Sequence, residues 1–307
     1  MNSPTRLNRR NLLKYSLSAP LLFGWPYGIR AGENLAERSL GGIKLSLNAY
    51  SFNQSLREGG ITLMGLIDFC VEAGFDAIDP TGYYFPGYPD SPPDEYLYAF
   101  RRKAYLAGIE ISGSGVRNDF THPDEEVRTE GVATVKRWVD VCVKMGCPLL
   151  RVFPGKEHPE VIPSKATTWI IEHLKECADY AGSKGILLAM QNHNDFVKNS
   201  DQVIEILEGV NSEWLGLHLD IGSFEERDAY SEIERLIKYA FTWQLKELVW
   251  QDNKKVKTDF ERLMGIIAKS GYRGYLPLET LGPGDPEKKV KVLITEVREA
   301  MEKEAAK

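Results

Sequence analysis

Eight short apolar runs, each followed by an amphipathic stretch, constrain the fold of this chain more than any other feature. The runs occupy residues 43–52, 75–80, 109–115, 148–154, 186–192, 214–220, 241–247 and 274–280. Apolar residues recur at helical spacing between them. Several of these stretches end at a glycine, where helices commonly stop: Gly74, Gly146, Gly185 and Gly271. Strands that alternate with helices form a parallel sheet, because each helix returns the chain to the edge where the next strand begins.

Closing a sheet of this kind gives an α/β fold, the (β/α)8 or TIM barrel, which typically needs about 250 residues. Residues 41–307 have that length. The alternative is an open, doubly wound sheet, which usually carries a glycine-rich phosphate loop after one strand. The nearest match, ISGSGV at 111–116, lacks the third glycine and has no strong helical pattern directly behind it. The sequence therefore predicts a single-domain TIM barrel over residues 41–307.

The first 40 residues differ from the rest in charge and pattern. The segment NRRNLLK at 8–14 precedes an apolar stretch of about fifteen residues, and twin arginines before such a stretch are typical of a twin-arginine export signal. The stretch is short for a membrane span, which needs about twenty residues. We therefore expect residues 1–40 to be an export signal with a linker, no stable membrane span, and a periplasmic protein. A basic disordered tail is the alternative.

The charge of the chain excludes one class of partner. The net charge is −6 in total and −10 without the first 40 residues. Nucleic-acid binding depends on Lys and Arg side chains that neutralise phosphates, so an acidic body argues against it. The sequence leaves the oligomeric state open, a homo-oligomer included.

Polar residues end nearly every predicted strand. The catalytic residues of a TIM barrel gather at the carboxyl ends of its strands, so these side chains are expected to converge on one rim. Each alone has a plainer interpretation: Asp79 precedes Pro80 and is consistent with a turn, and His218 with a buried core histidine. Their convergence is the stronger signal. The candidates are Tyr50, Asp79, Tyr84, Arg117, Arg151, Gln191, His193, Asn194, His218, Asp220, Gln244, Lys246 and Glu279.

Four of these candidates end neighbouring strands and suggest a metal site. Gln191, Asp220, Gln244 and Glu279 fall at the ends of the fifth to eighth runs. Two carboxylates and two amide oxygens form a hard, oxygen-rich set, which suits Mg²⁺ or Mn²⁺ better than a thiol-seeking metal. The alternative is that the two amides only form hydrogen bonds with a sugar.

Six segments make the chain resemble a known family. They are LSLNAYSF (45–52), DAIDPTGYYFPGYP (76–89), QNHNDF (191–196), GLHLDIGSF (216–224), WQLKE (243–247) and GYRGYLPLETLG (271–282). With them the chain resembles the sugar phosphate isomerase/epimerase family of xylose isomerase-like TIM barrels, and in particular an exported branch of it. The resemblance extends over residues 43–282.

The resemblance implies one divalent ion, held by a Glu, an Asp, a His or Gln, and a Glu on the fifth to eighth strands. Asp220, Gln244 and Glu279 match this set, whereas Gln191 stands where relatives often have glutamate. In the sugar epimerases two glutamates act on opposite faces of the sugar to move a proton beside a carbonyl. An amide cannot accept a proton as a carboxylate does. That pair is therefore incomplete here.

Three functional hypotheses follow. The first is a divalent-metal-dependent carbohydrate isomerase or epimerase with a Mn²⁺ or Mg²⁺ ion, in which Glu279 or His193 moves the proton. The second is a 3-keto-glycoside lyase or hydratase on the same scaffold, for which one base suffices. The third is a sugar-binding barrel without turnover. An endonuclease IV-like role needs a cluster of histidines, and this chain has five histidines in all. The expected sugar or glycoside contacts are Tyr50, Asp79, Tyr84, Arg117, Arg151, Asn194, His218 and Lys246.

Overall fold

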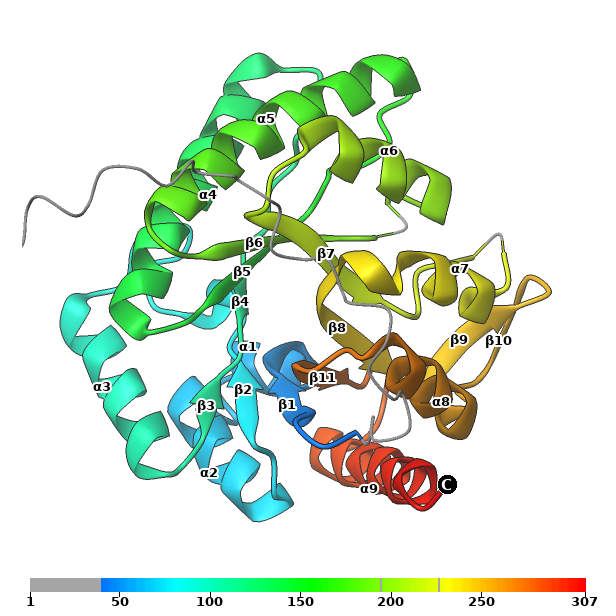
Figure 1. Ribbon diagram of the computed structural model, residues 1–307. Coiled ribbons are helices and arrows are strands. Elements are labelled where there is room, and N and C mark those ends of the chain that lie inside the picture. Colours follow the sequence, from blue (N-terminus) through cyan, green and yellow to red (C-terminus); the bar gives the residue numbers. More distant parts are fainter. Residues whose placement is uncertain (1–39, 194, 226) are drawn as a thin grey trace, which may run out of the picture. The chain divides into compact units, whose positions relative to one another are not determined.

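The fold is a parallel barrel surrounded by helices (Figure 1). It comes from a computed structural model that describes residues 40–193, 195–225 and 227–307. The predicted export signal, and residues 1–39 in general, lie outside the described residues. The barrel strands are β1 (Lys44–Asn48), β2 (Ala77–Asp79), β3 (Glu110–Ile111), β4 (Ser114–Gly115), β5 (Leu149–Val152), β6 (Leu187–Gln191), β7 (Leu215–Asp220), β8 (Ala240–Lys246) and β11 (Tyr275–Glu279).

The strand order confirms the predicted TIM barrel. The sheet runs β3-β2-β1-β11-β8-β7-β6-β5-β4, and each neighbouring pair is parallel. Its two ends, β3 and β4, come from the single run predicted at 109–115, which the structure divides into two short strands. An isolated parallel bridge between Thr81 and Gly115 joins the end of β2 to β4. The sheet is thus nearly closed.

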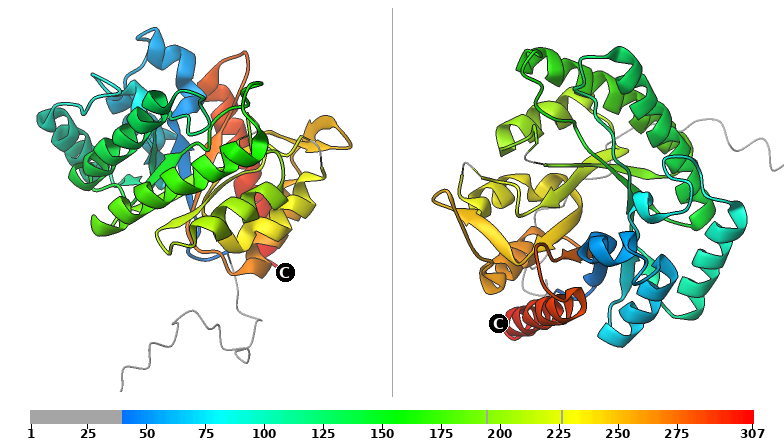
Figure 2. Two further views of the ribbon diagram at one scale, coloured as in Figure 1. Left: turned by 90° about the horizontal axis from the view of Figure 1, so that it is seen from above. Right: turned by 180° about the vertical axis from the view of Figure 1, so that it is seen from behind.

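Helices cover the outside of the barrel, as Figure 2 shows from two further directions. Gly74, Gly146 and Gly271 adopt a left-handed conformation directly after their helices, so three of the predicted glycine stops are confirmed as caps. Gly185 lies one residue beyond the cap of its helix. The helices are α1 (Asn53–Arg57), α2 (Leu63–Ala73), α3 (Asp94–Leu106), α4 (Glu125–Met145), α5 (Pro163–Ser183), α6 (Ser200–Val210), α7 (Ala229–Leu236), α8 (Phe260–Ser270) and α9 (Pro286–Ala305), with 3-10 turns at Ala49–Phe52, Gly82–Tyr84 and Ile237–Tyr239.

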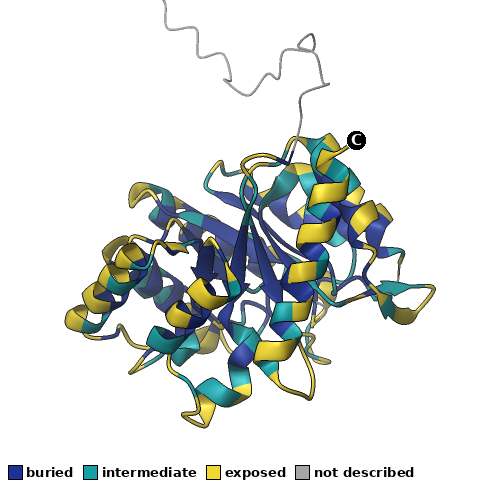
Figure 3. Cartoon of the chain, turned by 90° about the horizontal axis from the view of Figure 1, so that it is seen from below, coloured by how far each residue is buried: buried dark blue, intermediate teal, exposed yellow. Residues whose placement is uncertain are grey.

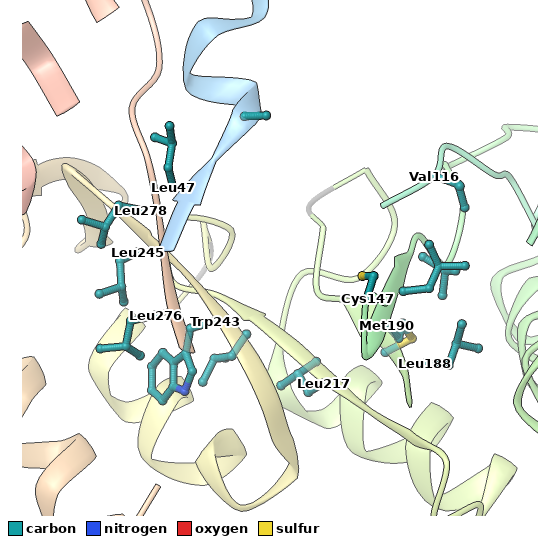
Figure 4. Close-up of a cluster of buried hydrophobic side chains, with 14 of the residues drawn as sticks. Leu47, Val116, Cys147, Leu188, Met190, Leu217, Trp243, Leu245, Leu276 and Leu278 are labelled. Atoms are coloured by element: carbon teal, nitrogen blue, oxygen red, sulfur yellow. The ribbon is translucent and has the colours of Figure 1, made fainter. Parts of the chain in front are cut away.

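The strands sort their side chains by polarity. Successive residues of a strand point to opposite faces of the sheet. Leucines of β7 therefore pack outwards against helices, whereas His218 and Asp220 point into the barrel. Figure 3 shows the strands buried at the centre, and Figure 4 shows the apolar layer around them, which includes Leu217 and Trp243. Burial of each such side chain stabilises the fold by about 1.5–3 kcal/mol.

One element is absent from the sequence-based prediction. After β8 the chain forms an antiparallel hairpin of β9 (Leu248–Gln251) and β10 (Lys254–Lys257). Its two turn residues, Asp252 and Asn253, have φ of 48° and 60°, which Asp and Asn tolerate better than most residues do.

Within the described parts of the chain, no helix is long and apolar enough to cross a membrane.

Candidate functional site

Four predicted site residues meet at the carboxyl end of the barrel. Gln191, Asp220 and Glu279 are the last residues of β6, β7 and β11, and Gln244 lies two residues before the end of β8. All four are nearly inaccessible to solvent, with exposed fractions between 0% and 4%. The strand register places Asp220 beside Gln244 and Glu279 beside Lys246. The predicted convergence on one point therefore occurs.

Hydrogen bonds link the two amides to the two carboxylates. Nε2 of Gln191 donates to Oδ2 of Asp220 at 2.7 Å, and Nε2 of Gln244 donates to Oε2 of Glu279 at 2.5 Å. The oxygen of each amide is also engaged. Oε1 of Gln191 accepts from Nη1 of Arg151 at 2.9 Å, and Oε1 of Gln244 lies 2.8 Å from Nε2 of His218 and accepts from Asn48 at 3.3 Å.

Lys246 places a positive charge between the carboxylates. Its Nζ atom lies 2.8 Å from Oδ2 of Asp220 and 3.2 Å from Oε2 of Glu279. Burial would lower the pKa of Lys246, but the two carboxylates outweigh burial and raise it. Burial would likewise raise the pKa of Asp220, but Lys246 outweighs burial and lowers it. The raised pKa of Lys246 and the lowered pKa of Asp220 both favour the charged forms of these side chains. A buried site tolerates such an ion pair because each ion has several hydrogen-bonding partners.

This arrangement does not fit the predicted divalent cation. A Mg²⁺ ion requires oxygen ligands in near-octahedral geometry at about 2.0–2.1 Å. Here the amides present nitrogen atoms to the carboxylates, and the ammonium group of Lys246 lies within hydrogen-bonding distance of both acids. Among the residues that the structure describes, no group of three or more His, Cys, Asp or Glu side chains is arranged to hold a metal ion.

Three predicted substrate contacts are buried within the barrel. Arg151 is 3% exposed, and its guanidinium passes so close to Gly115 that a Cβ there would lie 2.5 Å from Nη2. Asp79 is buried as well; burial raises its pKa, and nearby Arg151 lowers it in part. His218 is fully buried, and burial together with Arg151 lowers its pKa to about 3. Arg151 and His218 therefore contact the two glutamines from within the barrel, whereas Asp79 ends β2 and interacts electrostatically with Arg151.

Tyrosines form one edge of the mouth. The rings of Tyr50 and Tyr83 meet edge to face at 6.3 Å, and those of Tyr83 and Tyr84 at 5.2 Å. Arg117 lies over the ring of Tyr83 at 5.6 Å, and Tyr84 donates to Oδ1 of Asn53 at 2.7 Å. The predicted contacts Tyr50, Tyr84 and Arg117 are thus brought together. Tyr83, which was not among the candidates, joins them, and its place beside Tyr84 behind Asp79 was the available signal.

His193 borders a pocket at the same rim. The pocket has a volume of about 460 Å³ and is also lined by Arg117, Phe153 and Asp195. Nδ1 of His193 lies 3.2 Å from Oδ2 of Asp195, without the alignment of a hydrogen bond. Burial lowers the pKa of His193, against the opposing effect of Asp195. The remaining predicted contact, Asn194, lies outside the described residues.

Comparison with known families agrees with this architecture. A family profile described as "Xylose isomerase-like TIM barrel" matches residues 67–300. The chain belongs to this family. No match was found among curated protein sequences.

Solved structures of the xylose isomerase-like barrels are similar over most of this chain. D-psicose 3-epimerase with D-tagatose from Clostridium cellulolyticum H10 has a TM-score of 0.71 at 14% identity, covering 84% of this chain and 99% of its own. The IOLI protein with a binding zinc atom has a TM-score of 0.71 at 17% identity, covering 85% and 99%. The 3-keto-D-glucoside 4-epimerase YcjR from E. coli has a TM-score of 0.67 at 12% identity, covering 84% and 99%. At such low identities these similarities establish the fold.

Proposed function

We propose that this protein is an enzyme that isomerises or epimerises a carbohydrate by removing a proton beside its carbonyl group. The observation that carries the proposal is the pairing of Glu279 with Lys246 at the mouth of the barrel, where Nζ and Oε2 are 3.2 Å apart. A carboxylate can take a proton from carbon, and a neighbouring cation can stabilise the negative charge that then forms on the carbonyl oxygen. The sugar epimerases among the similar structures support this class of reaction.

The proton transfer uses the free side of Glu279. Gln244 and Lys246 both contact Oε2, so Oε1 is the oxygen that we assign to the substrate proton. As this proton leaves, the electron pair of the C–H bond forms a carbon–carbon double bond, the π pair of the carbonyl moves to its oxygen, and an enediolate results. Return of a proton to the neighbouring carbon completes an isomerisation, and return to the opposite face completes an epimerisation. His193, at the rim pocket, is the proposed second proton carrier.

The proposed substrate is a small sugar or glycoside. Tyr50, Tyr84 and Arg117 supply aromatic faces and hydrogen-bond donors at the mouth, a combination suited to a sugar ring with hydroxyl groups. The zinc of the IOLI protein supports a metal on this scaffold, whereas the contacts of Lys246 oppose the predicted Mn²⁺ or Mg²⁺ in this chain. Export through a twin-arginine signal remains part of the proposal, and it would place the substrate in the periplasm.

A second candidate, a 3-keto-glycoside lyase or hydratase, is favoured by one observation. Gln191, which occupies the place of a second catalytic glutamate, is fixed between Asp220 and Arg151 and supplies no base. Elimination of a glycosidic oxygen after proton removal needs only one base at carbon, and Glu279 can be that base.

Product analysis separates the candidates. Purified protein is incubated with a 3-keto-glucoside, D-fructose or D-tagatose, and products are identified by NMR and mass spectrometry. An isomer of unchanged mass supports the first candidate, and release of the aglycone with an unsaturated sugar supports the second. Binding without any product, detected by calorimetry, would favour a non-catalytic barrel and contradict both.

A further inference from the structure

We infer that the ammonium group of Lys246 replaces a divalent cation in this barrel, so that the site operates without a metal. The part of this inference that concerns catalysis rests on the proposed function. The part that concerns metal binding stands on the geometry of the site alone and can be tested on a protein of any activity.

The orientation of the two amides is fixed by their partners. Arg151 can only donate hydrogen bonds and an ionised Asp220 can only accept them. Gln191 must therefore turn its oxygen to Arg151 and its nitrogen to Asp220. In the same way the carboxylate of Glu279 requires the nitrogen of Gln244. Rotating either amide to offer its oxygen to a cation would place its nitrogen against a buried donor and its oxygen against a buried carboxylate. Neither contact could be a hydrogen bond.

The carboxylate oxygens already have donors. Oδ2 of Asp220 receives Lys246 and Gln191, and its Oδ1 accepts from the backbone N–H of Gly222 at 2.9 Å. Oε2 of Glu279 receives Lys246 and Gln244. A cation that bound here would have to displace the ammonium group and then leave it buried without a counter-ion.

The net charge of the site with Lys246 equals the net charge that a site with three carboxylates and a divalent ion would have. In the ligand set implied by the family resemblance, three carboxylates and one divalent ion sum to −1. Here Gln191 removes one negative charge and Lys246 supplies one positive charge, and the two remaining carboxylates again give −1. The ammonium group of Lys246 can therefore offset the charge of the two carboxylates without a metal ion.

The backbone also accommodates the lysine. A Cβ on Gly222, in the loop after β7, would lie 2.6 Å from Cδ of Lys246. A larger residue at position 222 would therefore require the side chain of Lys246 to shift from its present path towards Asp220. Lys246 and Gln244 are two residues apart on β8, so both point into the barrel.

The test compares metal binding by the wild type and two variants. Purified wild-type protein is analysed for metals by mass spectrometry, and its melting temperature is measured with EDTA and with added Mn²⁺. We expect substoichiometric metal and the same melting temperature in both. The double variant Gln191→Glu/Lys246→Ala restores three carboxylates and frees the space between them. We expect it to bind one Mn²⁺ per chain and to melt higher with Mn²⁺.

A matched control is Lys289→Ala, which removes another rim lysine whose partner is Glu247, 3.3 Å away, and should leave Mn²⁺ binding absent. One divalent ion per wild-type chain, or stabilisation of the wild type by Mn²⁺, would overturn the inference. A folded double variant that takes up no Mn²⁺ would overturn it too, because Lys246 would then not be what excludes the cation. A metal-free but inactive wild type would contradict the proposed function and leave this inference standing.

Discussion

Gln191 contributes to the site through the two ends of its amide, one bound to Asp220 and the other to Arg151. Replacing it with glutamate alone would place two carboxylate oxygens about as close as the present 2.7 Å, with no proton between them. We expect Gln191→Glu to lower the free energy of unfolding by about 1–3 kcal/mol at neutral pH. Urea denaturation measures this difference.

Gln251→Glu is a suitable control, because Gln251 also donates to an aspartate, Asp228, but at 3.4 Å and with partial exposure. Its effect should stay below about 1 kcal/mol, as is usual for pairs near the surface. Equal effects of the two substitutions would contradict the account of Gln191.

Glu279 is the base in the proposed reaction, and its removal should affect chemistry more than binding. The variant Glu279→Gln keeps the size of the side chain and cannot accept a proton from carbon. We expect the rate of turnover to fall by about 10²–10⁴-fold, the usual contribution of general acid–base catalysis, with little change in KM. Steady-state kinetics would test this, and a variant with wild-type turnover would remove Glu279 from the mechanism.

At the scale of elements, Asp119 ties together two loops beside the His193 pocket. Its Oδ1 accepts from the hydroxyl of Thr121 at 2.7 Å and from the backbone of Lys156 at 3.3 Å, and its Oδ2 lies 3.1 Å from Nε2 of His158. Burial would raise the pKa of Asp119, but the bonds from Thr121 and His158 outweigh burial and lower it.

A lowered pKa adds stability that is complete above the unfolded value, about 3.9, and is lost as the pH falls through the folded value. We therefore expect Asp119→Asn to be less stable than the wild type at pH 7 by about 1–3 kcal/mol. The difference should shrink at acidic pH, where the wild type loses its advantage. Thermal denaturation across this pH range measures it, with the surface variant Asp140→Asn as control. A difference that is the same at every pH would contradict the assigned role.

The strands show which features of the fold can be predicted from the sequence. Periodicity located the strands and the order of polar residues at their ends, because burial imposes that pattern directly. It merged β3 with β4 and missed the hairpin of β9 and β10, since short strands carry little pattern. The periodicity of the sequence also did not predict the shift in register between Leu217 and His218. That shift helps to determine which residues of β8 face the interior.

Across the whole molecule, sequence reasoning predicted which site residues meet but not how they are bonded. Gln191, Asp220, Gln244 and Glu279 converge because parallel strands end at one rim. The central role of Lys246 depends on side-chain directions across β7, β8 and β11, which no single segment encodes. Its spacing from Gln244 was a usable signal, because residues two apart on a strand share a face.

The most direct test of the account is deuterium exchange in the presence of EDTA. The wild-type protein is incubated in D₂O with a 3-keto-glucoside, and deuterium at the carbon beside the carbonyl is followed by NMR. We predict exchange that is unaffected by EDTA and is lost in Glu279→Gln. Exchange that stops with EDTA and returns with Mn²⁺ would contradict the account.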